Sequence, residues 1–301
     1  DVRLTVDAAL SETAWRALGA HRGAVVVMDA ATGAVLTMVS TPAVDPGTVE
    51  RDWDALTARA DSPLLNRVTQ GLYPPGSTFK PLIADTALTA GVTSEDEVFT
   101  CTGELAVGDY VLHESHGEAH GKLNLADALR ESCNVTFATL ALRLGASGLS
   151  KAFSRFGVGE ELTSPELMPA AAHVPELSQL SDGEIAQIGI GQGQILVTPL
   201  QMALIADAFA NNGEIMQPYL VDAVVAADGT AFYRGAPSVW RTATTPARAA
   251  LIDGYMAQVI AAGTGTAADV AGVRVTGKTG TAENATGTDH AWFIGSAEIK
   301  G

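Results

Sequence analysis

The segment that most constrains the fold of this chain is residues 73–81, which read YPPGSTFKP. Two prolines stiffen the entry, and the glycine after them permits a sharp turn. The apolar residues that follow recur at helical spacing, which predicts a helix over 77–90 with one face in the core and its start facing a cleft. Residues three positions apart share a helix face, so Ser77 and Lys80 are predicted to point at the same spot.

This pair of side chains can support nucleophilic chemistry. A serine hydroxyl is a weak nucleophile until a base removes its proton, and a nearby unprotonated lysine can be that base. The pKa of a free lysine is ~10.4, and lowering it to ~7 costs about 4–5 kcal/mol. Burial and a second nearby cation both act in that direction. Because Ser-x-x-Lys is common by chance, its interpretation depends on partners elsewhere in the chain.

The composition indicates a globular protein with a large core. The chain has 301 residues, 47% of them hydrophobic, enough for one large domain or two. The formal net charge is −16 and there is no basic stripe, which argues against a nucleic-acid partner. An anionic substrate would therefore have to be captured by local positive groups. Two cysteines, Cys101 and Cys133, are too few for a disulfide framework and allow either one bridge or two free thiols.

Strand-like segments lie near both ends of the chain, with helices between them. The predicted fold class is α/β of the α+β type, in which N- and C-terminal segments build a central antiparallel sheet with helices on both faces. A sheet subdomain is predicted at about 1–40 and 215–301, beside a mostly helical subdomain at about 75–214. Strand pairs are expected at 23–30 and 34–39, at 219–226 and 230–234, and at 272–281 and 290–299. Helices are expected at 8–20, 77–90, 124–131, 135–144, 147–156, 198–212 and 245–261.

A second polar group, Ser132-Cys133-Asn134, interrupts two predicted helices. A loop at this place can present side chains inward, where Ser132 can relay a proton. Asn134 offers both a donor and an acceptor, which suits a grip on a substrate amide. Cys133 is predicted to be a packing residue, since no histidine lies near it in the sequence. Taken alone, the same residues also fit an ordinary polar link between helices.

A third group stands on the strand predicted over 272–281 and reads Lys278-Thr279-Gly280-Thr281. Gly280 lets another backbone or a ligand approach the strand closely. Lys278 supplies a positive charge, and the hydroxyls of Thr279 and Thr281 face the same side because side chains alternate along a strand. Together they form a predicted receiver for a carboxylate. The alternative is a solvated lysine on an edge strand weakened by glycine.

The three groups follow the order S-x-x-K, S-x-N and K-T-G, a set typical of penicillin-binding proteins and serine β-lactamases. At these residues the chain resembles the transpeptidase domain of penicillin-binding proteins. The resemblance extends to the opening segments at 1–7 and 23–36, to Gly-Gln-Gly at 191–193, and to Thr-Pro-Leu-Gln at 198–201. It covers essentially all of 1–301.

The resemblance implies a role for each residue of the first two groups. Ser77 would attack the carbonyl of a D-alanyl-D-alanine bond, release D-alanine and pass the acyl group to an amine of a neighbouring peptidoglycan stem. Lys80 resembles the acylation base, and Ser132 resembles the relay that carries the proton to the leaving amine. Asn134 resembles the contact to the substrate amide. These roles lead us to expect Ser77 Oγ within hydrogen-bond reach of Lys80 Nζ, with Ser132 close by.

The third group is implied to form the opposite wall of the site. Lys278, Thr279 and Thr281 resemble the groups near the substrate carboxylate, with Gly280 between the two threonines. The backbone N–H groups of Ser77 and Thr281 would form the oxyanion hole. The resemblance implies no cofactor.

The resemblance favours a monofunctional (class B) enzyme, because no glycosyltransferase sequence precedes the first strand. Such proteins have a membrane anchor and a pedestal domain, neither of which is in this chain, and they work at the extracytoplasmic face of the bacterial cell membrane. The expected partners are peptidoglycan stem peptides, β-lactam antibiotics that acylate Ser77, and other cell-wall synthesis proteins, in cell division or cell shape.

Other members of the superfamily are alternatives: a D,D-carboxypeptidase, a serine β-lactamase, or a β-lactam receptor that is acylated and never turns over. A class A β-lactamase needs a carboxylate that activates the deacylating water. Glu160, Glu161 and Glu166 lie in the loop 158–180, but the Glu-x-x-Leu-Asn pattern is absent there. A class D-like enzyme pairs S-T-F-K with S-x-V, whereas the third position here is Asn134.

A metal site is the remaining alternative. His113, His116 and His120 are spaced so that they could bind a metal together with Glu114. The glycines among them indicate a loop, and a serine mechanism needs no metal. We therefore predict no metal site.

Overall fold

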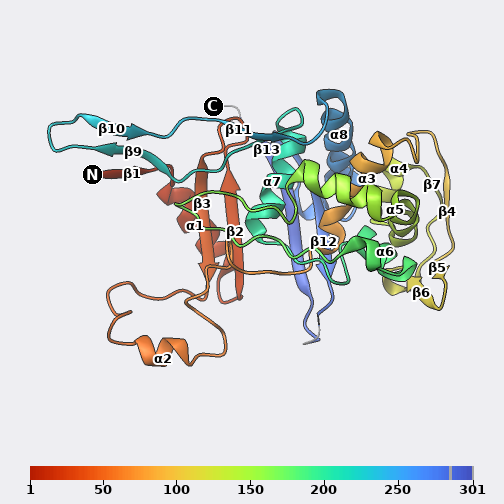
Figure 1. The fold of residues 1–301 in the computed structure, drawn as a ribbon, viewed down its shortest axis with the longest axis horizontal. Coiled ribbons are helices and arrows are strands. Elements are labelled where there is room, and N and C mark those ends of the chain that lie inside the picture. Colours follow the sequence, from red (N-terminus) through yellow and green to blue (C-terminus); the bar gives the residue numbers. More distant parts are fainter. Residues whose placement is uncertain (285–286, 300–301) are drawn as a thin grey trace.

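The computed structural model describes residues 1–284 and 287–299, as shown in Figure 1. Within these residues the α-helices are α1 (Ala8–Leu18), α2 (Trp53–Thr57), α3 (Lys80–Thr89), α4 (Leu125–Arg130), α5 (Asn134–Phe156), α6 (Asp182–Gly189), α7 (Pro199–Ala210) and α8 (Pro246–Ala262). Short 3-10 helices are η1 (Gly76–Phe79), η2 (Ser115–Gly117), η3 (Leu177–Gln179) and η4 (Thr266–Ala268). The strands are β1 (Val2–Leu4), β2 (Gly23–Met28), β3 (Val35–Thr41), β4 (Phe99–Cys101), β5 (Glu104–Val107), β6 (Tyr110–His113), β7 (Gly121–Leu123), β8 (Glu214–Met216), β9 (Val221–Val225), β10 (Ala231–Arg234), β11 (Val239–Thr242), β12 (Arg274–Ala282) and β13 (His290–Glu298).

Two antiparallel hairpins, one from each end of the chain, lie in the middle of the molecule (Figure 1). In β2–β3 Val25 lies opposite Val39, and in β12–β13 Thr279 lies opposite Phe293. Helix α1 packs on β3, α7 contacts both β2 and β13, and α8 lies against β12. The predicted α/β fold class is confirmed, although no ladder among the described residues joins the two hairpins into one sheet.

Local sequence explains where several helices begin. The side-chain oxygens of Asp7 and Asn124 each accept a hydrogen bond from the backbone N–H three residues later, and they cap α1 and α4. Thr198 and Thr245 do the same for α7 and α8, and each is followed by a proline at the first helical position. Proline is favoured there because its missing N–H has no partner in the first turn of a helix.

The helical part contains one predicted break and one helix that the patterns do not predict. The break in α5 is confirmed, since Gly145 has φ 59° and ψ −176° inside it. Helix α6 is absent from the sequence prediction, although Ser181 and Glu184 form a capping box at its start. The sequence does not predict this helix because its glycines lower the helix propensity of the segment. Gly189 is required by packing, since a Cβ there would lie 2.5 Å from Ala141 Cβ of α5.

Glycines also let three chain segments meet at η1. Gly76 N donates a hydrogen bond to Gly191 O at 2.8 Å, and a Cβ on Gly191 would lie only 2.1 Å from Gly76 O. On the other side, a Cβ on Gly280 would lie 3.0 Å from Thr78 N. The predicted close approach of a backbone at Gly280 is therefore confirmed, and the approaching segment is η1 itself.

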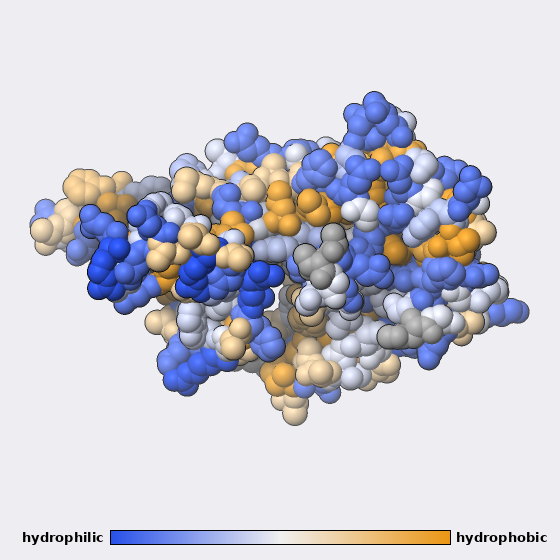
Figure 2. All heavy atoms as spheres, turned by 90° about the horizontal axis from the view of Figure 1, so that it is seen from below, coloured by the Kyte–Doolittle hydropathy of each residue, from blue (hydrophilic) through white to orange (hydrophobic). Residues whose placement is uncertain are grey.

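Two parts extend from the body of the molecule in Figure 1. Strands β1, β9 and β10 form a three-stranded arm on which Phe232 is 76% exposed, and α2 sits on the long loop between β3 and η1. The face in Figure 2 carries hydrophilic and hydrophobic residues interspersed. None of the described helices is both long and apolar enough to cross a membrane.

We predict that Gly191→Ala destabilises the fold more than Gly108→Ala. Both glycines have positive φ, 70° and 58°, so both substitutions carry a similar backbone cost of about 1 kcal/mol. Only the new methyl at 191 overlaps another backbone, which adds about 1–3 kcal/mol. Urea titration of both variants measures the free energies of unfolding. Equal losses would contradict the packing of the Gly191 turn against η1.

Candidate active site

Ser77 is the second residue of η1, directly before α3, and its side chain is half-buried. The chain that leads to it is held on both sides. Trp292 Nε1 on β13 donates a hydrogen bond to Pro74 O at 3.0 Å, and Thr78 Oγ1 donates to Pro75 O at 2.6 Å. These bonds fix the backbone at Ser77 without using its hydroxyl.

Lys80 is fully buried at the start of α3, and its ammonium group is enclosed by the second motif. Lys80 Nζ donates to Ser132 O at 2.6 Å, to Ser132 Oγ at 3.2 Å and to Asn134 Oδ1 at 2.8 Å. The ring of Phe137 lies 5.5 Å away on another side. The S-x-x-K and S-x-N motifs therefore meet through one amine.

Lys278 of β12 reaches the same hydroxyl from the opposite side. It is fully buried, and its Nζ donates to Ser132 Oγ at 2.9 Å and to Thr279 O at 2.9 Å. Ser132 itself has φ 59°, in the left-handed region that serine seldom occupies. This conformation presents both the hydroxyl and the carbonyl of Ser132 to the lysines. The structure thus brings Lys80, Ser132 and Lys278 together.

One predicted contact is wrong. No hydrogen bond joins Ser77 Oγ to Lys80 Nζ within the described part of the chain, because the three acceptors on Ser132 and Asn134 match the three N–H donors of the ammonium group. In this arrangement the amine of Lys80 contacts the second motif, and the hydroxyl of Ser77 makes no hydrogen bond among the described residues.

Burial sets the acid–base properties of both lysines. Desolvation lowers the pKa of Lys80 to about 8, against the opposing charges of Glu114 and Cys133. Desolvation also lowers the pKa of Lys278 well below its usual value, and the charge of Lys80 lowers it further. The expected influence of one lysine on the other is therefore present, and because repulsion between two cations is mutual, a charge on either amine favours the neutral form of the other. Two ammonium groups that share one hydroxyl in the interior resist being charged together.

The K-T-G strand separates its side chains as predicted. Lys278 and Gly280 are buried toward η1, whereas Thr279 is half-buried and Thr281 is exposed. Thr279 Oγ1 is 2.5 Å from Thr264 Oγ1, which lies just before η4. The side chains of Thr279 and Thr281 therefore lie on the other side of β12 from that of Lys278, and the carboxylate receiver stays a prediction.

Glu114 is a positioning residue that sequence reasoning linked only to a metal. It is 4% exposed, and its carboxylate accepts hydrogen bonds from Asn134 N at 2.9 Å and from Val135 N at 2.7 Å. Burial alone would raise the pKa of Glu114, but the hydrogen bonds from Val135 and Asn134 hold it below its usual value. Glu114 therefore holds the start of α5 and, with it, the S-x-N motif. No pattern in the sequence predicts that Glu114 is buried.

Two of the three histidines that were considered as metal ligands, His113 and His120, lie near different carboxylates. The side chain of His113 is 64% exposed and points to Glu104 at 3.7 Å, while His120 lies 3.8 Å from Glu114. The side chain of His116 lies outside the described part of the structure. Cys133 is fully buried, as a packing residue would be, and both it and Cys101 are free thiols.

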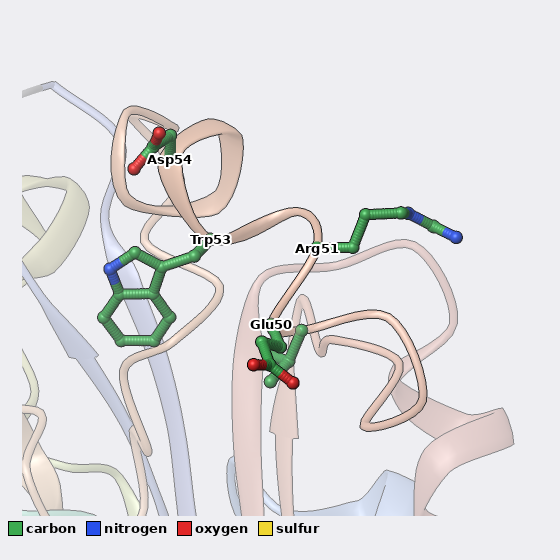
Figure 3. Close-up of a pocket in the computed structure, with 5 residues that line it drawn as sticks. Glu50, Arg51, Trp53 and Asp54 are labelled. Atoms are coloured by element: carbon green, nitrogen blue, oxygen red, sulfur yellow. The ribbon is translucent and has the colours of Figure 1, made fainter.

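Two other hollows lie away from these motifs. The close-up in Figure 3 shows one of about 520 Å³ on the α2 segment, where Arg51 and Trp53 point in different directions and no serine or lysine lines the hollow. The second, of about 590 Å³, is lined mainly by the second half of α5 and by residues 174–178. Neither contains a residue of the three motifs, so the convergence at Ser132 is the stronger candidate for chemistry.

Comparison with known proteins identifies the family. The family model described as "Penicillin binding protein transpeptidase domain" matches residues 23–301. Peptidoglycan D,D-transpeptidase PbpA of Mycolicibacterium smegmatis is 32% identical over 99% of this chain, and the chain spans 64% of that protein's length.

Two solved structures resemble the whole fold. The D,D-transpeptidase domain of a peptidoglycan glycosyltransferase from Eggerthella lenta has a TM-score of 0.94 at 35% identity, over 99% of this chain and 75% of that one. Penicillin-binding protein A of Mycobacterium tuberculosis, as its ceftriaxone acyl-enzyme complex, has a TM-score of 0.89 at 30% identity, over 98% and 71% of the two chains. The chain belongs to the penicillin-binding protein transpeptidase family.

We predict that Lys80 loses its proton with a pKa of about 8. Its folded-state pKa is lowered, so the amine becomes neutral as the pH rises through 8 instead of through the usual range near 10.4. NMR titration of the lysine ε-carbons measures this value, and the resonance missing from Lys80→Arg identifies the residue. An ε-carbon of Lys80 that still titrates near 10.4 would contradict the burial of its amine.

Proposed function

We propose that this chain is the catalytic part of a peptidoglycan D,D-transpeptidase that acts through an acyl-enzyme on Ser77. The observation that carries the proposal is the pair of buried amines, Lys80 and Lys278, that share the hydroxyl of Ser132 beside the start of η1. Lys80 and Ser132 would supply a proton path to the leaving group once substrate binding brings the hydroxyl of Ser77 to Lys80. The family membership and the acyl-enzyme complex of the mycobacterial relative support the same chemistry.

Acylation requires the proton of Ser77 to move as its Oγ bonds to the carbonyl carbon. Neutral Lys80 accepts this proton, once substrate binding brings the hydroxyl and the amine together. Ser132 then passes a proton to the amine of the departing D-alanine and is replenished from Lys80. An acceptor amine on a second stem peptide attacks the ester and regenerates the serine. The backbone N–H groups of Ser77 and Thr281 are the proposed oxyanion hole.

Substrate binding also adjusts the charge of the two lysines. The terminal carboxylate of the substrate is proposed to bind the hydroxyls of Thr279 and Thr281 near Lys278. A carboxylate there favours the charged form of Lys278, and a charged Lys278 in turn favours the neutral form of Lys80. The substrate would therefore help to prepare its own base. Asn134, already oriented by Glu114, is the proposed contact to the substrate amide, and Gly280 keeps the strand close to η1.

The remaining assignments follow from this reaction. The proposed place of action is the extracytoplasmic face of a bacterial membrane, where peptidoglycan is cross-linked, with stem peptides as substrates and β-lactams as inhibitors. Other cell-wall synthesis proteins are proposed as partners. We also propose a division into a sheet subdomain at about 1–40 and 215–301 and a helical subdomain at about 75–214.

The contacts of Glu160 and Glu166 argue against either of them acting in β-lactam hydrolysis. Glu160 pairs with Arg241 at 2.8 Å, and Glu166 accepts hydrogen bonds from Leu220 N and Val221 N. Both carboxylates are thus engaged in structural contacts and are not free to activate a water at Ser77. A D,D-carboxypeptidase and a receptor that never turns over differ from a transpeptidase only in what happens to the acyl ester on Ser77.

We predict that penicillin forms a covalent adduct with the wild-type chain and none with Ser77→Ala. Removing the hydroxyl removes the attacking atom, while the lysines and Ser132 stay in place. Intact-mass spectrometry over time measures the adduct, with Ser150→Ala, an exposed serine on α5, as the matched control. An adduct that persists in Ser77→Ala would overturn the nucleophile. Rapid loss of the wild-type adduct would favour a β-lactamase, and faster loss with an added acceptor amine would support the transpeptidase.

We predict that the acylation rate rises with pH and levels off above about 8, the pKa of Lys80. Only the neutral amine can accept a proton, and its fraction grows from about a tenth at pH 7. Lys80→Arg keeps a permanent cation and should lower the rate about 10²–10⁴-fold and remove this pH dependence. Lys122→Arg, an exposed lysine on β7, is the control. The same pH profile in Lys80→Arg would assign the base to another residue.

A further inference from the structure

Asp253 is a buried acid that lies outside the three motifs, yet it binds the strand that carries the third one. It belongs to α8 and is 8% exposed. Its Oδ1 accepts a hydrogen bond from Thr276 Oγ1 of β12 at 2.7 Å, and its Oδ2 accepts one from Arg274 Nη2. The Thr276 hydroxyl is also 2.9 Å from Ser296 Oγ on β13. Both oxygens of Asp253 are therefore bonded to β12, and the proposed reaction uses neither.

A buried carboxylate is a costly way to join a helix to a strand. Taking the charge out of water is unfavourable, and apolar side chains of similar size often hold such a contact equally well. What the carboxylate adds is direction, because its oxygens bind donors at definite places. Apolar packing alone tolerates small shifts of a strand along a helix. Asp253 instead fixes Thr276 and Arg274 at the same time, which leaves β12 one position against α8.

The residue that Asp253 fixes is a close neighbour of the lysine in the third motif. Thr276 and Lys278 are two positions apart on β12, so their side chains point to the same face of the strand. They are 1% and 0% exposed. From this face Lys278 Nζ reaches Ser132 Oγ at 2.9 Å. A shift of β12 by about 1 Å along its axis would take this contact out of hydrogen-bond range.

Helix α8 also packs against the element that precedes Ser132. It contacts α4, which ends at Arg130, two residues before the serine. A Cβ on Gly263, directly after α8, would lie 2.6 Å from Arg130 O, so the two backbones approach closely. The same helix therefore contacts both sides of the Lys278–Ser132 pair. It meets β12 through Asp253 and the end of α4 through Gly263.

We propose that Asp253 is a positioning residue for acylation, which sets where the amine of Lys278 meets the hydroxyl of Ser132 by holding Thr276 and Arg274 against α8. The inference rests on the proposed function, in which Ser132 relays a proton to the leaving amine. Lys278 donates to the relay hydroxyl and so orients it. Asp253 contacts neither the relay nor the nucleophile in this structure, and it acts on the reaction only through Lys278.

The first test is the rate at which penicillin acylates each variant, followed by intact-mass spectrometry at a temperature where circular dichroism shows the variant to be folded. The rate should fall about 10–100-fold in Asp253→Ala and in Thr276→Val, because small misplacements of reacting groups have effects of this size. Thr276→Ser keeps the hydroxyl and should restore the rate. Ser296→Ala and Glu298→Gln are matched controls, since they remove only the other partners of Thr276 and Arg274. Both should stay within about twofold of wild type.

The second test needs no substrate and measures the pKa of Lys278 by NMR titration of its ε-carbon. Burial and the charge of Lys80 lower the pKa of Lys278 well below its usual value. Both causes weaken when β12 shifts, so the pKa should rise toward ~10.4 in Asp253→Ala and Thr276→Val. It should stay unchanged in the two controls. The resonance missing from Lys278→Arg identifies the residue.

The two measurements together separate positioning from stability. A purely structural role for Asp253 would lower the folded population without moving the pKa of Lys278 in the folded chain. An unchanged pKa of Lys278 in folded Thr276→Val overturns the proposal, as does an unchanged acylation rate. If Asp253→Ala does not fold, Thr276→Val and Thr276→Ser carry the same comparison. A wild-type chain that forms no penicillin adduct would defeat the proposed function instead, and the titration would still test where Asp253 places Lys278.

Discussion

The site depends on placing two lysine amines in the interior on either side of one serine hydroxyl. A buried ammonium group is costly unless its hydrogen bonds are satisfied, and two of them a few ångströms apart are costlier still. Lys80 meets this cost with three acceptors on Ser132 and Asn134, and Lys278 meets it with a hydroxyl and a carbonyl. Burial lowers the pKa of both lysines, and this makes an amine available as a base near neutral pH.

Much of the surrounding fold can be understood as support for that placement. Lys80 is carried by a helix, Lys278 by a strand, and Ser132 by a strained turn between two helices. The strand can approach the helix start because Gly280 has no side chain to meet Thr78. Trp292 and the turn at Gly191 fix the same helix start from two further sides. Side chains larger than hydrogen at these glycines would push the motifs apart.

Sequence patterns predicted the elements that carry the motifs more completely than the contacts between them. The break at Gly145 and the alternation of Thr279 and Thr281 are local, so residue order is enough to reveal them. Helix α6 was not predicted because the glycines that allow it to pack closely also lower its helix propensity. The burial of Glu114 was hidden because it depends on a loop folding back against the start of α5.

The sequence by itself determined the family resemblance and the candidates for nucleophile, relay and carboxylate receiver, because these depend on residue types in a fixed order. Only the tertiary structure decided which groups touch. It placed Lys80 on the second motif instead of on Ser77, since three acceptors there match its three donors. It also brought Cys101 and Cys133 beside Glu114 and His120. Long-range packing sets these contacts, and no local pattern encodes it.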